Sequence, residues 1–186
     1  MQIRKICLLG LMVLSHMVTL AQPGDANPLG DFWADFCTSL NHYVQEAPDG
    51  FVRSRGEAQA DGGNLTCKFP IPGAQDCYLV EDQQGQFTLV GIFEETPDSL
   101  VAGQAYSALI SLINSCPLAC CKLIFEETRQ EYFRTTYWVN LDITGSGDPV
   151  FDHLLLEVRQ AQLMRIHPEH GLQQVYIVAL NIGIRS

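Results

Sequence analysis

Apolar residues recur at helical spacing in the segment that begins near residue 31. The stripe ends before Pro48-Asp49-Gly50, a sequence typical of a turn. Its members are Phe32, Phe36, Leu40, Tyr43 and Val44, with Trp33 and Cys37 beside them. The pattern predicts an amphipathic helix that lays an aromatic face on an apolar surface.

A second helix is predicted after Thr96-Pro97-Asp98, where threonine is a helix cap, proline suits the first helical position and an acid follows. The segment ends before Pro117. Its predicted apolar face consists of Val101, Ala105, Leu109, Leu112 and Ile113.

The other apolar segments are short and rich in β-branched and aromatic residues, which favours strands. Three strands are expected between the helices and four after the second. They are Phe51–Glu57, Cys77–Glu81 and Gln86–Glu94, then Lys122–Glu127, Tyr132–Leu141, Val150–Arg159 and Gln173–Ile184. Asp61–Asn64 and Gly145–Asp148 are read as loops.

This order of elements predicts an α+β fold in which two helices pack on one face of an antiparallel sheet. Helix, strands, helix, strands is also the order of a tandem helix-plus-meander arrangement. That layout is similar to the layout of β-lactamase inhibitor proteins, and the resemblance implies a sheet face that contacts another protein. No motif matches residue by residue, so the resemblance assigns no site.

The first residues have a different pattern. Arg4 and Lys5 precede an apolar run, Ile6–Leu20, that ends at Ala21. A charged start, a short apolar core and a small residue at the end define a cleavable signal peptide. We therefore expect a signal peptide at 1–21, a polar leader at 22–30, and a single exported domain at 31–186, periplasmic or secreted, with no transmembrane segment in the mature chain.

The chain has 11 Lys and Arg against 21 Asp and Glu, a formal net charge of −10. Removal of the signal peptide takes away Arg4 and Lys5 and no acid. A chain this acidic is repelled by phosphate backbones, so nucleic acid is not expected as a partner.

Six cysteines remain after the expected cleavage, and an even number in an exported chain indicates disulfides. They are Cys37, Cys67, Cys77, Cys116, Cys120 and Cys121. Cys67 and Cys77 flank a Pro-Gly loop and form a plausible local pair. Adjacent Cys120 and Cys121 would form a strained ring, so each is expected to find a distant partner or one to stay free.

Motifs of catalysis are sparse. The chain has no nucleophile elbow, phosphate loop or dinucleotide fingerprint, and no cofactor is expected. His167, Glu169 and His170 form a weak candidate metal cluster, since histidines three residues apart can converge on a divalent ion. Pro168 and Gly171 favour a plain solvated loop instead.

The strongest recognition signal is the aromatic strand around residue 135. Tyr132, Arg134 and Trp138 fall on one face of that strand, and these three residue types dominate contacts between proteins. The sequence favours a non-catalytic binding protein whose open sheet face, centred on these residues, contacts a protein or an extracellular ligand. The alternatives are a small exported hydrolase or metal-dependent enzyme, and an envelope-associated structural protein.

Overall fold

The computed structural model describes residues 28–59, 63–130, 133–141, 149–167, 169 and 171–185. These residues contain two α-helices, eight strands and two short 3-10 helices, Ala47–Asp49 and Pro149–Phe151. The expected signal peptide lies outside these residues. In chain order the elements are α2 (Pro28–Glu46), β1 (Arg55–Ala58), β2 (Asn64–Cys67), β3 (Asp76–Glu81), β4 (Phe87–Thr96), α3 (Ser99–Ser115), β5 (Lys122–Gln130), β6 (Phe133–Leu141), β7 (Leu154–His167) and β8 (Gly171–Ile184).

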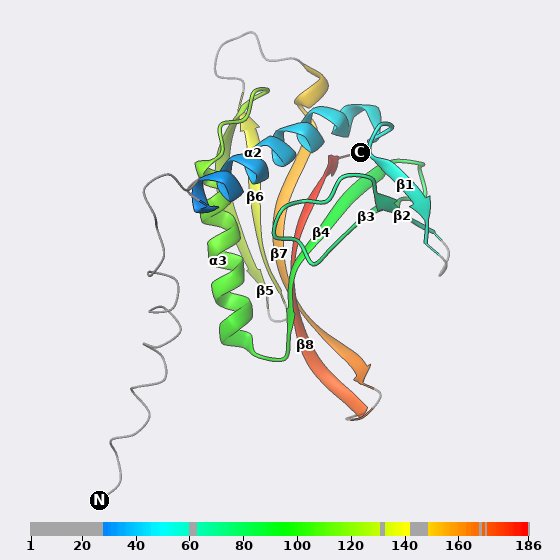
Figure 1. The fold of residues 1–186 in the computed structure, drawn as a ribbon, viewed down its shortest axis with the longest axis vertical. Helices are drawn as coiled ribbons and strands as arrows, with labels where there is room; N and C mark the ends of the chain where they lie inside the picture. Colours follow the sequence, from blue (N-terminus) through cyan, green and yellow to red (C-terminus); the bar gives the residue numbers. More distant parts are fainter. Residues whose placement is uncertain are drawn as a thin grey trace, which may run out of the picture. The chain divides into compact units, whose positions relative to one another are not determined.

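The strands form one antiparallel sheet in the order β1-β2-β3-β4-β8-β7-β6-β5. Each helix is followed by a meander of four strands, and the last strands of the two meanders, β4 and β8, pair with each other. On each side of the β4–β8 boundary, the strands therefore follow one another in reverse chain order, β4-β3-β2-β1 on one side and β8-β7-β6-β5 on the other. Both helices cover one face of the sheet (Figure 1), so the predicted α+β class and helix-plus-meander order are confirmed.

The core lies between the helices and this sheet. From α2 it receives Phe36, Leu40, Tyr43 and Val44, all buried, as the helical spacing predicts. Phe32 and Trp33, at the start of the same stripe, are each 40% exposed. The sheet contributes the fully buried side chains Leu79, Leu89, Leu156, Val158, Val178, Leu180 and Ile182.

The second helix differs from its prediction in its cap and in its buried face. Asp98 caps it, accepting hydrogen bonds from the backbone N–H groups of Leu100 and Val101, while Thr96 still belongs to β4. The buried residues are Ala102, Tyr106, Leu109 and Ile113, and Val101 is exposed. The helix is apolar on several sides, so spacing alone does not select the buried stripe.

Several strand bounds also differ from their predictions. The largest difference is at β7, which was expected to end at Arg159 and runs to His167. The structure adds β2, where the sequence indicated a surface loop ending at Asn64. Residues 51–54 form a turn before β1, with Phe51 in the left-handed region at φ 61°. Pro149–Phe151 is a short 3-10 turn that precedes β7. The new strand gives the first half four strands, like the second.

Two disulfides connect described cysteines. Cys67 and Cys77 are joined as predicted, between β2 and β3, and Cys37 is joined to Cys116 across 79 residues of sequence. Cys120 and Cys121 are free. Neither described helix is long and apolar enough to cross a membrane.

The two disulfides should differ in their contribution to stability because they close loops of different length. Loop-closure entropy gives about 4–5 kcal/mol for the 79-residue separation and about 3 kcal/mol for the 10-residue separation. We expect the paired variant Cys37→Ser/Cys116→Ser to lose more unfolding free energy than Cys67→Ser/Cys77→Ser. Urea unfolding of both measures this, and the reverse ranking would contradict it.

Candidate functional site

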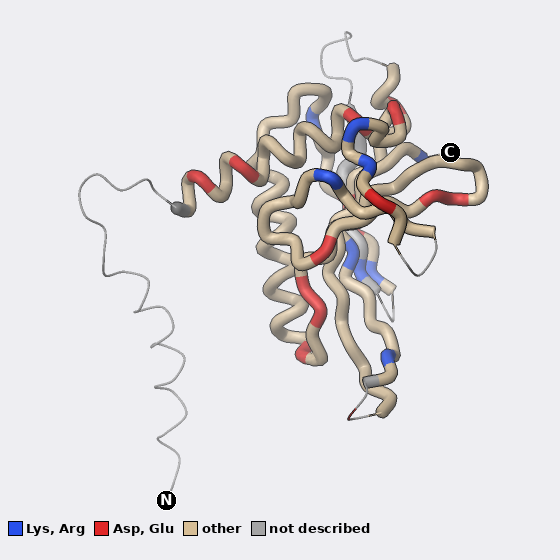
Figure 2. The backbone as a smooth tube through the Cα atoms, turned by 45° about the vertical axis from the view of Figure 1, so that its right-hand side comes forward, with Lys and Arg blue, Asp and Glu red and all other residues tan. Residues whose placement is uncertain are grey.

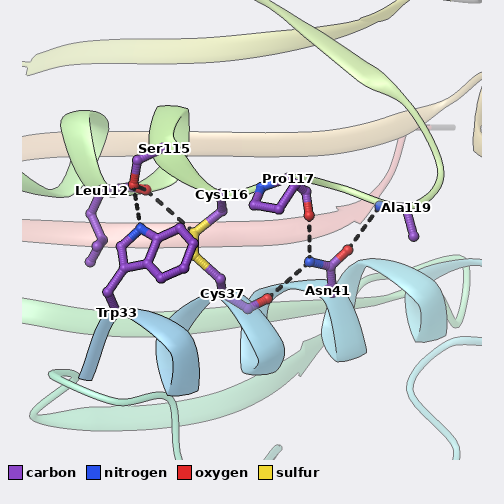
Figure 3. The surroundings of a disulfide bond; sticks show 8 residues. All are labelled: Trp33, Cys37, Asn41, Leu112, Ser115, Cys116, Pro117 and Ala119. Carbon is purple, nitrogen blue, oxygen red and sulfur yellow. Dashed lines mark hydrogen bonds between the residues drawn. A yellow bond between two sulfur atoms is a disulfide. The ribbon is translucent and has the colours of Figure 1, made fainter. Parts of the chain in front are cut away.

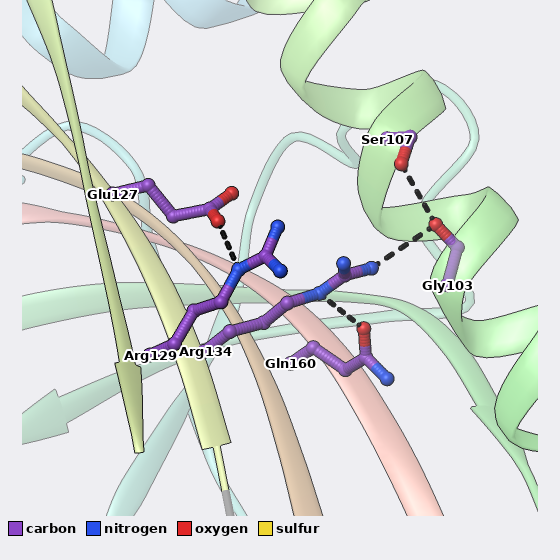
Figure 4. Close-up of polar contacts among 6 residues, drawn as sticks. All are labelled: Gly103, Ser107, Glu127, Arg129, Arg134 and Gln160. Atoms are coloured by element: carbon purple, nitrogen blue, oxygen red, sulfur yellow. Dashed lines mark hydrogen bonds and ion pairs between the residues drawn. The ribbon is translucent and has the colours of Figure 1, made fainter.

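Arg134 of β6 lies between the sheet and α3. Its guanidinium carbon is 3.9 Å from the centroid of the Tyr106 ring, and its Nη2 donates to the Gly103 carbonyl at 3.2 Å. Its Nε donates to Oε1 of Gln160 at 2.7 Å, while a neighbouring ion pair joins Glu127 and Arg129 (Figure 4). The Arg134 side chain thus fastens α3 to β6 and β7.

This position differs from the open sheet face on which the sequence placed Arg134. Tyr132 and the side chain of Trp138 lie outside the described residues; the backbone of Trp138 belongs to β6 and pairs with Leu156. A binding role for these three residues stays a prediction. The three contacts described for the Arg134 side chain are with Tyr106, Gly103 and Gln160 of this chain.

The histidine cluster falls at the turn between β7 and β8. His167 pairs through its backbone with Gly171, and Glu169 is exposed in the turn. Pro168, His170 and the side chain of His167 lie outside the described residues. Among the residues that are described, no group of three His, Cys, Asp or Glu could hold a metal ion.

The same two strands form an arm that extends past their neighbours. The last β7 residue paired with β6 is Ala161, and the last β8 residue paired with β4 is Tyr176. Beyond these points residues 162–167 and 171–175 pair with each other (Figure 1). Within the described structure, the outer backbone edges of this arm therefore have no strand beside them.

One face of the arm is apolar and exposed. Ile166 is directly opposite Leu172, and Met164 is two residues before Ile166 on the same face. The exposed fractions of Ile166, Leu172 and Met164 are 84%, 67% and 58%. We call these three residues the arm patch.

The arm differs from the rest of the chain in charge as well. Figure 2 shows Asp and Glu on α2, on loops and on several strands, and a hairpin arm that is mostly uncharged. Arg165 is the basic residue of the arm, and it forms an ion pair with Glu95 of β4. An apolar surface with little charge is what a contact between proteins requires at its centre.

A polar cluster near the end of α2 was missed from the sequence. Glu46 is 1% exposed, with its Oε1 2.8 Å from Nε of Arg53 and 3.5 Å from Nε2 of His42. That same His42 nitrogen is 3.0 Å from Oγ of Ser54, which is fully buried. Serine and carboxylate face one ring nitrogen rather than opposite ones, so the cluster lacks the relay of a serine hydrolase. It is a buried carboxylate paired with the exposed Arg53.

Tyr43, beside His42, is a second buried polar group. Its hydroxyl donates a hydrogen bond to the Phe69 carbonyl. Burial raises the pKa of Tyr43 to about 12. The neutral phenol is therefore the form that the folded chain favours.

A set of contacts joins α2 to the last residue of α3 and to the segment that follows it (Figure 3). Nε1 of Trp33 donates to Oγ of Ser115 at 2.8 Å, and Cys37 forms its disulfide with Cys116. One turn further along α2, Asn41 donates to the Pro117 carbonyl at 2.8 Å and accepts from the Ala119 N–H at 3.0 Å. We call Trp33, Cys37 and Asn41, spaced four residues apart on one face of α2, the helix clamp.

The raised pKa of Tyr43 predicts a loss of stability at alkaline pH. Below pH 10 the phenol is neutral in both states; as pH rises towards 12 the unfolded chain releases its proton first, so unfolding becomes easier. In Tyr43→Phe this dependence is absent. The stability advantage of the parent over the variant should shrink by up to about 2 kcal/mol between pH 10 and 12.

Urea unfolding at a series of pH values measures this difference. The comparison with Tyr43→Phe is needed because burial also raises the pKa of Tyr78. A parent–variant difference that does not change with pH would contradict the assignment.

Comparisons were made with models of protein families, with curated proteins and with solved structures. None of the three found a match to this chain.

Proposed function

We propose that this chain is an exported, disulfide-bonded, non-catalytic binding protein that contacts a protein partner through the arm patch. Export is inferred from the predicted signal peptide at 1–21. The disulfides Cys37–Cys116 and Cys67–Cys77 support it, because such bonds persist in oxidising compartments. The observation that carries the binding role is the exposure of Ile166, Leu172 and Met164 on one face of the arm.

Exposure of these apolar side chains to water is unfavourable, and a partner that covers them would gain the free energy of their burial. Burying a side chain such as Ile, Leu or Met contributes about 1.5–3 kcal/mol. Contiguous exposed apolar residues on a soluble protein commonly mark an interaction site, whereas single exposed ones need no explanation. Ile166 and Leu172 are cross-strand neighbours, so they act as one surface.

The chemistry of the partner follows from the arm's backbone as well as its side chains. Among the described residues, no strand lies beside the edges at 162–167 and 171–175, so these edges offer N–H and C=O groups to an added strand. The partner we propose is therefore a protein with an extended apolar segment that pairs with one of these edges and covers the arm patch. The acidity of the whole chain disfavours an acidic partner.

The test compares a double variant, Ile166→Thr/Leu172→Thr, with the parent mature chain, residues 22–186. Threonine keeps strand propensity while it shortens both apolar side chains. The matched control is Val52→Thr, an exposed apolar residue in the turn before β1, 64% exposed. Proteins captured from the native extracytoplasmic extract are identified, and the affinity of each purified candidate is then measured by calorimetry.

We expect a partner whose affinity falls by about 10- to 100-fold with the double variant, since about 1.5–3 kcal/mol of burial is lost. The control should bind like the parent. Equal binding by the double variant and the parent would reject the arm patch as the contact surface. Circular dichroism and the thermal midpoint establish that each variant is folded.

A further inference from the structure

Cys120 and Cys121 lie in the short connection between α3 and β5, half-buried. Their Sγ atoms are 2.7 Å apart. The residue before them, Ala119, is held by its hydrogen bond to Asn41 of the helix clamp. The backbone that carries the two thiols is thus positioned by a hydrogen bond to α2.

The other four described cysteines are already joined in pairs. Each of the two thiols therefore has its sequence neighbour as the nearest available disulfide partner within the described chain. The sequence predicted a distant partner for each thiol or one free thiol, whereas in the structure both are free and in contact.

We propose that Cys120 and Cys121 are a redox modification site, which small-molecule disulfides convert to a reversible disulfide between the two neighbours. An S–S bond measures about 2.05 Å, so the sulfur atoms need a short approach to join. The site is half-exposed, which gives a small disulfide access to it. This inference is independent of the proposed binding function.

The reaction balances as two exchanges. The Cys120 thiolate attacks a small disulfide R–S–S–R, forms a mixed disulfide with one R–S group and releases the other as a thiolate. Cys121 then loses its proton and attacks the Cys120 sulfur, which expels the second R–S⁻. The two cysteines lose two electrons and two protons, and the small disulfide is reduced to two R–SH.

The direction of the two pKa shifts favours Cys120 for the first step. The hydrogen bond between the two sulfur atoms lowers the pKa of Cys120 and raises the pKa of Cys121. The thiolate is the nucleophilic form of cysteine. Cys120 therefore attacks the external disulfide, and Cys121 resolves the mixed disulfide.

Geometry makes the new bond easier to reduce than the two structural disulfides. Consecutive Cα atoms across a trans peptide are about 3.8 Å apart, shorter than the roughly 4.4–6.8 Å that disulfides normally span. The Cα atoms of Cys37–Cys116 and Cys67–Cys77 are 5.2 and 5.5 Å apart, within that range. Strained disulfides have higher reduction potentials and are the labile ones.

The experiment equilibrates the mature chain, residues 22–186, in a series of reduced-to-oxidised glutathione ratios. Acid quench, alkylation of free thiols and mass spectrometry of the intact chain and its peptides then report the state of each cysteine. Cys120→Ser and Cys121→Ser are the matched controls, each with one remaining thiol at the site.

We expect the parent to close the Cys120–Cys121 bond in oxidising buffers without accumulating a glutathione adduct. The bond should reopen at a reduced-to-oxidised ratio at least tenfold lower than the ratio that opens Cys67–Cys77. Cys121→Ser should hold glutathione on Cys120, because the resolving thiol is missing.

Three results would overturn the proposal. In the first, both thiols stay free for alkylation at every ratio. In the second, the parent carries stable glutathione adducts or disulfides between two chains. In the third, the Cys120–Cys121 bond reopens together with Cys67–Cys77.

Discussion

The pairing of β4 with β8 is the interaction on which the rest of the fold depends. Each strand ends one meander, and their antiparallel contact merges two four-stranded meanders into a single sheet. Leu89, Leu180 and Ile182 on these strands are fully buried, which gives α2 and α3 a common apolar surface. The helix clamp joins α2 to the end of α3. The two helix-plus-meander halves are therefore connected both by the sheet and by contacts between their helices.

The sequence predicted the fold well because the helices and most strands carry their own patterns. Predictions from local patterns were wrong or incomplete where contacts with distant parts of the chain determine the local structure. β2 is four residues of mixed polarity whose strand conformation depends on β1 and β3. In α3 the buried face is set by Tyr106, which packs under the Arg134 guanidinium from a distant strand. The Cys67–Cys77 pair was predictable from its short loop, whereas the Cys37–Cys116 pair depends on the packing of two helices.

The candidate site was less predictable than the fold, for a related reason. The predicted strands ended at Arg159 and resumed at Gln173, so the sequence did not predict residues 160–167 and 171–172 as strand. The exposure of Leu172 and Ile166 therefore had no sequence signal. The sequence placed Arg134 on an open sheet face, but its side chain contacts α3 and Gln160 of β7. The arm and the thiol pair have one property in common. Each lies at the edge of a body that strand pairing and disulfides hold together elsewhere.

Hydrogen–deuterium exchange of the isolated mature chain tests most directly whether a protected body carries an arm with open edges. Amides whose groups bond within the β4–β8 pairing, around Leu89–Ile92 and Leu180–Ile182, should exchange slowest. Amides on the outer edges of residues 162–167 and 171–175 should exchange much faster. Protection of these arm edges equal to that of the β4–β8 centre would contradict the account, because it would show the edges already covered in the free protein.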